Sequence, residues 1–117
     1  MQARLVAFGV LEIEGQRYEH DVVVEQGQLR KRKKEPSKAY RDEYGHTPLS
    51  ADEDIPWSAR LLVIGSGAAG QLPVMAEVLA EAERHGVEVV VEPTEDACRR
   101  LATLEPGEFA AILHVTC

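Results

Sequence analysis

A glycine-rich loop directly after an apolar run is the first pattern in this sequence that could bind a ligand. Residues 65–70 spell G-x-G-x-x-G after the run at 61–64, and Glu92 follows about where a ribose-binding acid would stand. In dinucleotide-binding proteins the helix opens within the motif, so that its N-terminus meets the pyrophosphate. Here Pro73 marks the expected helix start, beyond the last glycine, and the chain is too short for a second mononucleotide half. We therefore expect no NAD or FAD, and a glycine loop that makes a tight strand exit.

Two histidines and two cysteines could supply metal ligands or a nucleophile: His46, His114, Cys98 and Cys117. No pair has the C-x-x-C or H-x-x-x-H spacing of a zinc site. On a strand, His114 and Cys117 would point to opposite faces, because they are an odd number of positions apart. We expect no metal and no other cofactor, we assign no catalytic residue, and we allow a cysteine–histidine pair only if Cys117 leaves the strand.

A run of positive charge interrupts an otherwise acidic chain of net charge −7. Every position from 30 to 34 is charged, which predicts that neither face of this segment is buried. One interpretation, which we favour, is an exposed edge strand whose lysines prevent pairing with other sheets. The other is a docking strip for an acidic partner or a phosphate group. The candidate docking residues are Arg30, Lys31, Arg32, Lys33, Lys34 and Lys38.

The elements that would position these residues are a strand, a helix and a second strand. The apolar run at 61–64 predicts a strand buried on both faces. After Pro73, the apolar residues Val74, Val78 and Ala82 recur every four positions, which predicts an amphipathic helix. This helix is expected to end at Gly86. Alternation at 87–92 predicts a strand nearer the sheet edge. So short a connection implies a right-handed parallel crossover.

The remaining segments are predicted from the same periodicities. A β-meander is expected near the N-terminus, with a strand over 4–13 that has a bulge at Gly9, a half-buried strand over 17–25 and a third strand from Gln28. Residues 35–60 read as an irregular segment, with a possible capping box at 50–53. A helix capped by Thr94 and a buried strand over 109–115 complete the chain.

These strands predict a site at one end of the sheet. The expected spatial order is 87–92, then 61–64, then 109–115, with the two helices on opposite faces. Ligands of open α/β sheets bind beyond the carboxyl ends of strands where the winding reverses. The candidate crevice residues are therefore Gly65, Ser66, Gly67, His114 and Cys117, with His46 on the rim. We expect the loop amides to be available to an anion.

Length and composition limit the function classes. The chain has 117 residues, which suits a single domain over 1–117. Two cysteines are too few for a disulfide framework, and no apolar run is long enough to span a membrane. We expect a cytoplasmic protein without nucleic-acid or membrane partners.

Several motifs together resemble a known family. They are FGVLEIEGQRYEHDVVV near the start, KRKKEPSK followed by YGHT, LLVIGSG, VEVVVEPTEDA and the ending LHVTC. This combination is similar to the domain of unknown function 498, over essentially the whole chain. The resemblance implies an α/β fold with a central mixed sheet, helices on both faces and an added N-terminal β-hairpin or meander layer. It implies no catalytic residues.

Two functional hypotheses follow. Mitochondrial members of the resembled family help assemble other proteins, so the first is a non-enzymatic binding or assembly-helper protein with a protein partner. The second is an enzyme or small-molecule (anion) sensor that uses the crevice at Gly65–Gly67. A pocket with a titratable group of shifted pKa would favour the second hypothesis, and a flat apolar patch the first. The sequence does not predict an oligomeric state.

Overall fold

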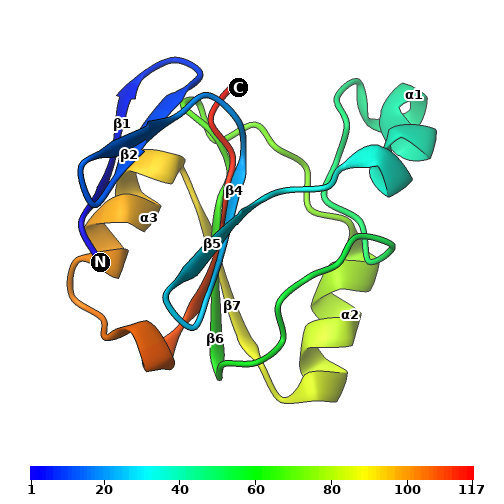
Figure 1. The fold of residues 1–117 in the computed structure, drawn as a ribbon. Coiled ribbons are helices and arrows are strands. Elements are labelled where there is room, and N and C mark those ends of the chain that lie inside the picture. The colour runs from blue at the N-terminus through cyan, green and yellow to red at the C-terminus, as the bar shows by residue number, and fades with distance from the viewer.

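The structure, a computed structural model that describes residues 1–117, contains two sheets and three α-helices (Figure 1). The five-stranded sheet has the order β5-β4-β8-β6-β7. Its strands are β4 (Val22–Glu25), β5 (Gln28–Lys31), β6 (Leu61–Gly65), β7 (Glu88–Glu92) and β8 (Ala110–Leu113). β7, β6 and β8 are parallel, while β4 pairs antiparallel with β8 and β5. The predicted mixed sheet and its order from 87–92 through 61–64 to the last strand are confirmed.

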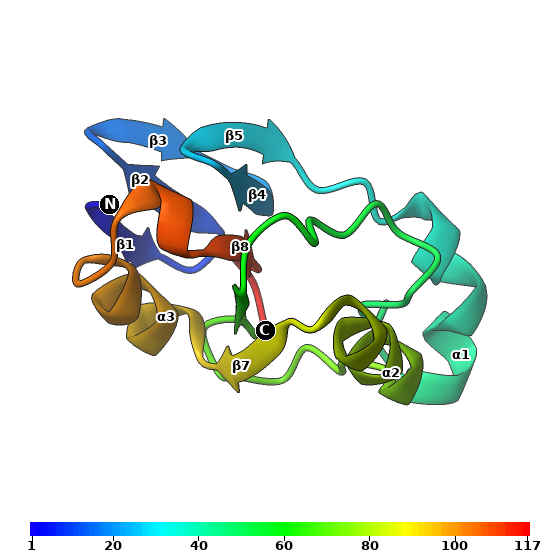
Figure 2. The same cartoon turned by 90° about the horizontal axis from the view of Figure 1, so that it is seen from below.

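Two apolar cores cover the two faces of this sheet. The helix α2 (Ala76–His85) packs on one face, where Val78 and Ala82 meet Leu62 and Ile64 of β6. The helix α3 (Thr94–Leu101) packs on the other, around Val63. Figure 2 shows the two helices on opposite sides of the strands, as right-handed crossovers from the central strand require.

A separate three-stranded antiparallel sheet adds the expected extra layer. It consists of β1 (Ala3–Ala7), β2 (Val10–Ile13) and β3 (Gln16–Tyr18). Leu11 and Ile13 of β2 are buried in the same core as α3. The expected single strand over 4–13 with a bulge at Gly9 is wrong, because the chain turns at this glycine, where φ is +83°, and forms a hairpin.

The expected half-buried strand over 17–25 is also wrong. The chain bends at residues 19–20, so β3 and β4 belong to different sheets. Val22, Val23 and Val24 are all buried, because β4 lies between β5 and β8 and both of its faces are covered. The alternation in the sequence had suggested one exposed face, whereas the tertiary structure covers both.

The helix α2 begins at Ala76 rather than at Pro73. The amide of Leu49 donates to the carbonyl of Pro73, and the amide of Met75 donates to the carbonyl of Leu49. These bonds hold residues 73–75 extended beside the long loop, so the helix starts later. The predicted end is confirmed, because Gly86 caps the helix at a φ of +69°.

The segment between the two halves of the main sheet is irregular, as expected. It contains the 3-10 helix η1 (Glu35–Tyr40) and the short helix α1 (Arg41–Tyr44). A further 3-10 turn, η2 (Pro106–Glu108), precedes β8. Residues 50–53 form a single turn, in which the amide of Asp52 donates to Ser50 Oγ and the amide of Glu53 donates to the Ser50 carbonyl. The capping box is incomplete and no helix follows, because the Glu53 carboxylate is bonded to Arg32 instead. None of the helices has the length and apolar character needed to cross a lipid bilayer.

Candidate functional site

The largest pocket with a concentration of positive charge lies between the η1–α1 segment and the end of the chain after β8. It has a volume of about 330 Å³. Its lining residues are Arg32, Lys34, Lys38, Arg41, Gly45, His46, Thr47, Leu72, His114, Thr116 and Cys117. We call this the basic pocket. It brings part of the expected docking strip together with His46, His114 and Cys117 of the expected crevice.

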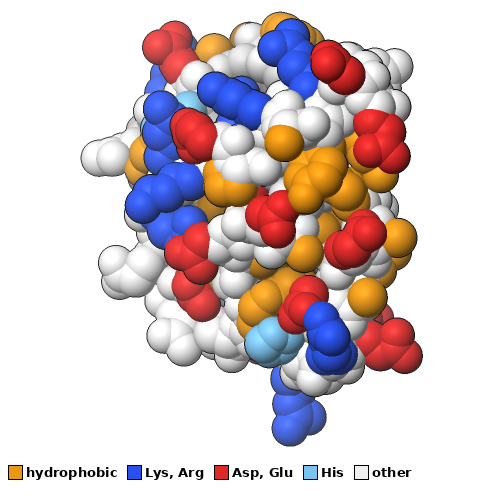
Figure 3. All heavy atoms as spheres, turned by 90° about the vertical axis from the view of Figure 1, so that its right-hand side faces the viewer, with side chains coloured by type: hydrophobic (Ala, Val, Ile, Leu, Met, Phe, Trp, Pro, Cys, Tyr) orange, Lys and Arg blue, Asp and Glu red, His pale blue; other side chains and the backbone are white.

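Three cations of the basic pocket have no acidic partner. Lys34, Lys38 and Arg41 are exposed, and none lies within ion-pair distance of a carboxylate. The lining contains no Asp or Glu. Figure 3, which views the molecule from the side of α1 and α2, shows Lys and Arg side chains gathered along one side of this face. The chain has 20 acidic residues, yet none pairs with these three cations. The three cations are therefore free to bind an external anion.

Arg32 differs from the rest of the strip because its side chain is buried. Only 4 % of the residue is exposed, so the expectation that no face of 30–34 is buried is wrong. Its guanidinium donates to Glu53 through Nε at 2.8 Å and Nη2 at 2.7 Å, and to Asp21 Oδ2 through Nη1 at 2.9 Å. Burial acts to lower the pKa of Arg32, but the two carboxylates outweigh it and raise that pKa.

Further hydrogen bonds complete the environment of Glu53. Ser37 of η1 donates its hydroxyl to Glu53, and its Oγ lies 2.7 Å from that of Ser50. Arg32 Nη2 also donates to the carbonyl of Pro48. Every buried side-chain nitrogen and oxygen of the protein has a partner. Arg32 therefore fixes the pocket wall to the loop at 48–53 and is not free to dock a partner.

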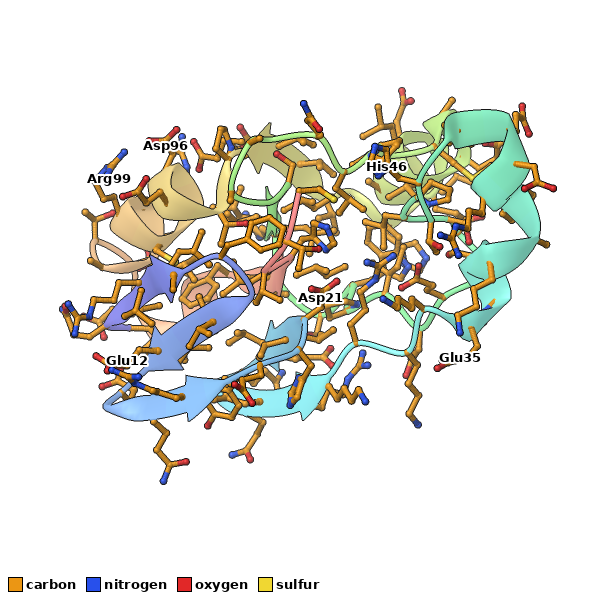
Figure 4. The ribbon with its side chains drawn as sticks, turned by 90° about the horizontal axis from the view of Figure 1, so that it is seen from above. Glu12, Asp21, Glu35, His46, Asp96 and Arg99 are labelled. Carbon is orange, nitrogen blue, oxygen red and sulfur yellow. The ribbon has the colours of Figure 1, made fainter.

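Asp21 connects this ion cluster to His114 at the floor of the pocket. Oδ2 of Asp21 lies 2.7 Å from His114 Nδ1, and Oδ1 accepts the amide of Val115 at 2.9 Å. In Figure 4, Asp21 lies just before the start of β4, with His46 and Glu35 toward α1 and η1. Burial acts to raise the pKa of Asp21, but the bonds from His114, Val115 and Arg32 outweigh it and lower that pKa to about 2. The carboxylate is thus ionised at neutral pH.

An ionised Asp21 determines which nitrogen of His114 carries a proton. A carboxylate can only accept, so Nδ1 must donate to it. In a neutral imidazole Nε2 is then an acceptor, and it lies 3.2 Å from the hydroxyl oxygen of Thr116. Asp21, His114 and Thr116 therefore form a hydrogen-bonded chain that ends at the basic pocket.

The glycine loop does not line the basic pocket, and its amides are not available to an anion. The amides of Ser66, Gly67 and Ala68 donate to Glu92 O, Thr94 Oγ1 and Thr116 O. Residues 114–117, which follow β8, thus fill the crevice that was expected at the carboxyl ends of β6 and β8. The expectation of free loop amides is wrong, because the chain itself satisfies them.

Gly67 and His114 do lie side by side. A Cβ at Gly67 would lie 2.2 Å from the carbonyl oxygen of Thr116 and 2.9 Å from the His114 ring. Thr94 contributes to the same junction, since its hydroxyl donates to the His114 carbonyl at 2.6 Å. Thr94 is the first residue of α3 rather than its predicted cap, and Pro93 occupies the cap position.

Cys117 reaches the basic pocket because β8 ends at Leu113. The last four residues are irregular, so the strand argument that separated His114 from Cys117 does not apply. Cys117 Sγ lies 3.7 Å from His46 Nδ1. The other cysteine, Cys98, lies on the buried face of α3, where burial raises its thiol pKa to about 11. No group of three His, Cys, Asp or Glu side chains has the arrangement of a metal site.

Comparison with known protein families assigns the chain. The family described as protein of unknown function (DUF498/DUF598) matches residues 4–114. The chain belongs to the DUF498 family. No curated protein sequence matches it.

Solved structures agree with this DUF498 assignment. The conserved hypothetical protein PH1505 from Pyrococcus horikoshii OT3 is 30 % identical, with a TM-score of 0.79 and complete coverage of both chains. MT938 is 28 % identical, with a TM-score of 0.72, covering 99 % of this chain and 98 % of the other. A Bordetella pertussis protein described as an Mth938-like domain shares the fold at 17 % identity, with a TM-score of 0.59 and coverage of 96 % and 85 %.

Sequence reasoning missed several residues of this DUF498 site. Asp21 looked like a solvent-facing position of an alternating strand, and Glu53 like part of a capping box. No pattern in the sequence marked them, because Arg32, whose buried guanidinium needs both carboxylates, reads as one exposed cation of a charged run. Thr47 and Thr116 lay in the motifs YGHT and LHVTC, and Arg41 lay near the positive run, but nothing local predicted that these three residues would meet at one pocket.

Proposed function

We propose that this DUF498 protein is a non-enzymatic binding protein whose ligand places an anionic group in the basic pocket. The observation that carries the proposal is the group of three unpaired cations, Lys34, Lys38 and Arg41, around a pocket without an acidic side chain. Part of the expected docking strip and three of the expected crevice residues, His46, His114 and Cys117, line this pocket, whereas Gly65–Gly67 do not.

The electrostatic reason is the mutual repulsion of these cations. An anion between them relieves that repulsion and accepts charge-assisted hydrogen bonds, each worth about 1.5–3 kcal/mol. The hydroxyl of Thr47 and the imidazole of His46 add donors on the same lining. We also propose a cytoplasmic location, supported by the two free cysteines.

A second candidate function is catalysis at His114. The observation in its favour is the chain from Asp21 through His114 to Thr116, in which Nε2 has the orientation of a general base. Turnover of a small anionic ester, lost in His114→Gln while anion binding persists, would favour an enzyme. Binding without turnover would favour the binding protein.

The binding proposal is tested by titration calorimetry with inorganic phosphate, glutarate and a short oligoglutamate peptide. The double variant Lys38→Gln/Arg41→Gln should lose most of the affinity of the protein for the anions. Lys33→Gln is the matched control, because Lys33 is exposed but lies outside the pocket. Equal affinities in both variants would exclude the basic pocket as the site. Preference for the peptide over both small anions would favour an acidic protein partner.

A further inference from the structure

A second pocket adjoins the basic pocket and shares part of its wall. Its volume is about 240 Å³. Four residues, Arg32, Lys34, His114 and Thr116, line both pockets. A ligand held by its anionic group in the basic pocket therefore has room to extend past His114 and Thr116 into the second pocket.

The second pocket contains side chains of both charges. Glu19 and Glu35 lie there with Lys31 and Lys34, and none of these four forms an ion pair within the protein. Its other acid and cation, Asp21 and Arg32, are already paired with each other. The second pocket is thus close to neutral, unlike the basic pocket.

This mixed lining selects against three kinds of ligand body. A second anionic group would meet Glu19 and Glu35, and a cationic group would meet Lys31 and Lys34. An apolar body would find a single apolar side chain, Val115. Hydroxyl groups both donate and accept, so they can bond to carboxylates and ammonium groups at once. The chemistry that fits is a neutral body with several hydroxyls.

The charge of the basic pocket indicates the group at the other end. A phosphate monoester carries about −1.5 to −2 charges at pH 7 and three acceptor oxygens. Three unpaired cations match that charge better than they match a single carboxylate. Arg41 adds a planar fork that suits phosphate oxygens.

We infer that the ligand is a phosphate monoester of a small polyhydroxylated compound, such as a sugar phosphate, with its phosphate in the basic pocket and its hydroxyls in the second pocket. This inference rests on the proposed function of the basic pocket. It adds the class of ligand and assigns Glu19 and Glu35 as residues that bind the hydroxylated body.

The test compares four probes by titration calorimetry: glucose 6-phosphate, inorganic phosphate, hexyl phosphate and glucose. Glucose 6-phosphate should bind about tenfold more tightly than inorganic phosphate, the gain expected from two additional hydrogen bonds. Hexyl phosphate should bind no better than phosphate, and glucose should not bind measurably. The double variant Glu19→Gln/Glu35→Gln should lose the advantage of the sugar phosphate, because the amides are weaker acceptors, and should keep its affinity for phosphate.

The outcomes separate this inference from the proposed function. Equal affinities for phosphate and glucose 6-phosphate, or a preference for hexyl phosphate, would overturn the inference and leave the anion site intact. An advantage of the sugar phosphate that survives in Glu19→Gln/Glu35→Gln would also overturn it. If none of the phosphates binds, the proposed function itself fails. Circular dichroism spectra confirm that each variant is folded.

Discussion

Arg32 and Glu53 form a bidentate ion pair inside the protein, with Nε–Oε1 at 2.8 Å and Nη2–Oε2 at 2.7 Å. The side chains are 2 % and 3 % exposed. The pair joins the residue after β5 to the loop at 48–53, two segments 21 positions apart in the sequence. It therefore holds one wall of the basic pocket, and the pocket depends on it.

Breaking this pair should destabilise the protein strongly. Arg32→Gln leaves Asp21 and Glu53 buried without their cation, and the loss of one partner of a buried pair costs about 3–5 kcal/mol. Urea unfolding followed by circular dichroism measures the change. Lys31→Gln and Lys33→Gln are the controls, and each should change the free energy of unfolding by less than about 0.5 kcal/mol, because both side chains are exposed. Similar small losses in all three variants would contradict the buried role of Arg32.

Asp21 should make stability depend on acid pH. Its pKa is lowered in the folded protein from an ordinary 3.8 to about 2. A depressed folded-state pKa gives stability that is fully present above the unfolded pKa and lost as pH falls toward the folded value. The shift corresponds to about 2 kcal/mol, lost between about pH 4 and pH 2.

The measurement is the free energy of unfolding between pH 5 and pH 2. Asp21→Asn should start from a lower stability and lose less of it over that range. Parallel curves for the two proteins would mean that the carboxylate is not selectively stabilised by His114, Val115 and Arg32.

The close approach of Gly67 to the end of the chain predicts a large effect of one methyl group. In Gly67→Ala the new Cβ would lie 2.2 Å from the Thr116 carbonyl oxygen, at a φ of +106°. The segment at 116–117 must move, and the strained backbone alone costs about 1–3 kcal/mol. Gly15→Ala has a similar positive φ of +83° but no atom within 4 Å, so it should cost only about 1–2 kcal/mol.

Thermal and urea unfolding compare these two glycine variants. Phosphate affinity gives a second readout, because Thr116 and Cys117 line the basic pocket. Gly67→Ala should reduce that affinity and Gly15→Ala should not. Equal stability and equal affinity in the two variants would show that the close packing at Gly67 does not shape the site.

The two cysteines should differ in reactivity. Burial raises the pKa of the Cys98 thiol to about 11, so little thiolate is present at pH 8. Cys117 is half-buried at the pocket. Iodoacetamide at pH 8 should alkylate Cys117 in the native protein and Cys98 only after unfolding. Peptide mass spectrometry locates the label, and prompt native labelling of Cys98 would contradict its position on the buried face of α3.

Phosphate should compete with this alkylation, because a bound anion occupies the pocket that Cys117 lines. The expected result is slower labelling of Cys117 with phosphate than with an equal concentration of glucose. Lys38→Gln/Arg41→Gln should abolish the protection. Protection that persists in this variant would place the anion elsewhere.

The local sequence was enough to predict the central unit of the fold. The apolar run at 61–64, the amphipathic stripe that ends at Gly86 and the strand at 87–92 are short-range patterns. The exposed face of 87–92 placed that strand outermost, and crossover handedness then put the two helices on opposite faces of the sheet. The alternation of apolar and polar residues predicted the burial of β4 wrongly. This alternation shows which residues share a face of a strand, but it does not show what packs on each face. Val22, Val23 and Val24 look half-exposed in the sequence and are buried because both neighbouring layers cover them.

The functional site was decided by tertiary structure. The sequence determined which groups are present, among them a positive run, His46 and His114, two cysteines and a glycine loop. It did not determine that Arg32 turns inward while Lys34 stays free, since that choice depends on Asp21 and Glu53, which are distant in the sequence. Nor did it predict that residues 116–117 would take the loop amides. The burial of Arg32 and the bonding of the loop amides each remove polar groups from water, which costs free energy. Pairing with other groups offsets that cost, and only the folded chain brings these partners together.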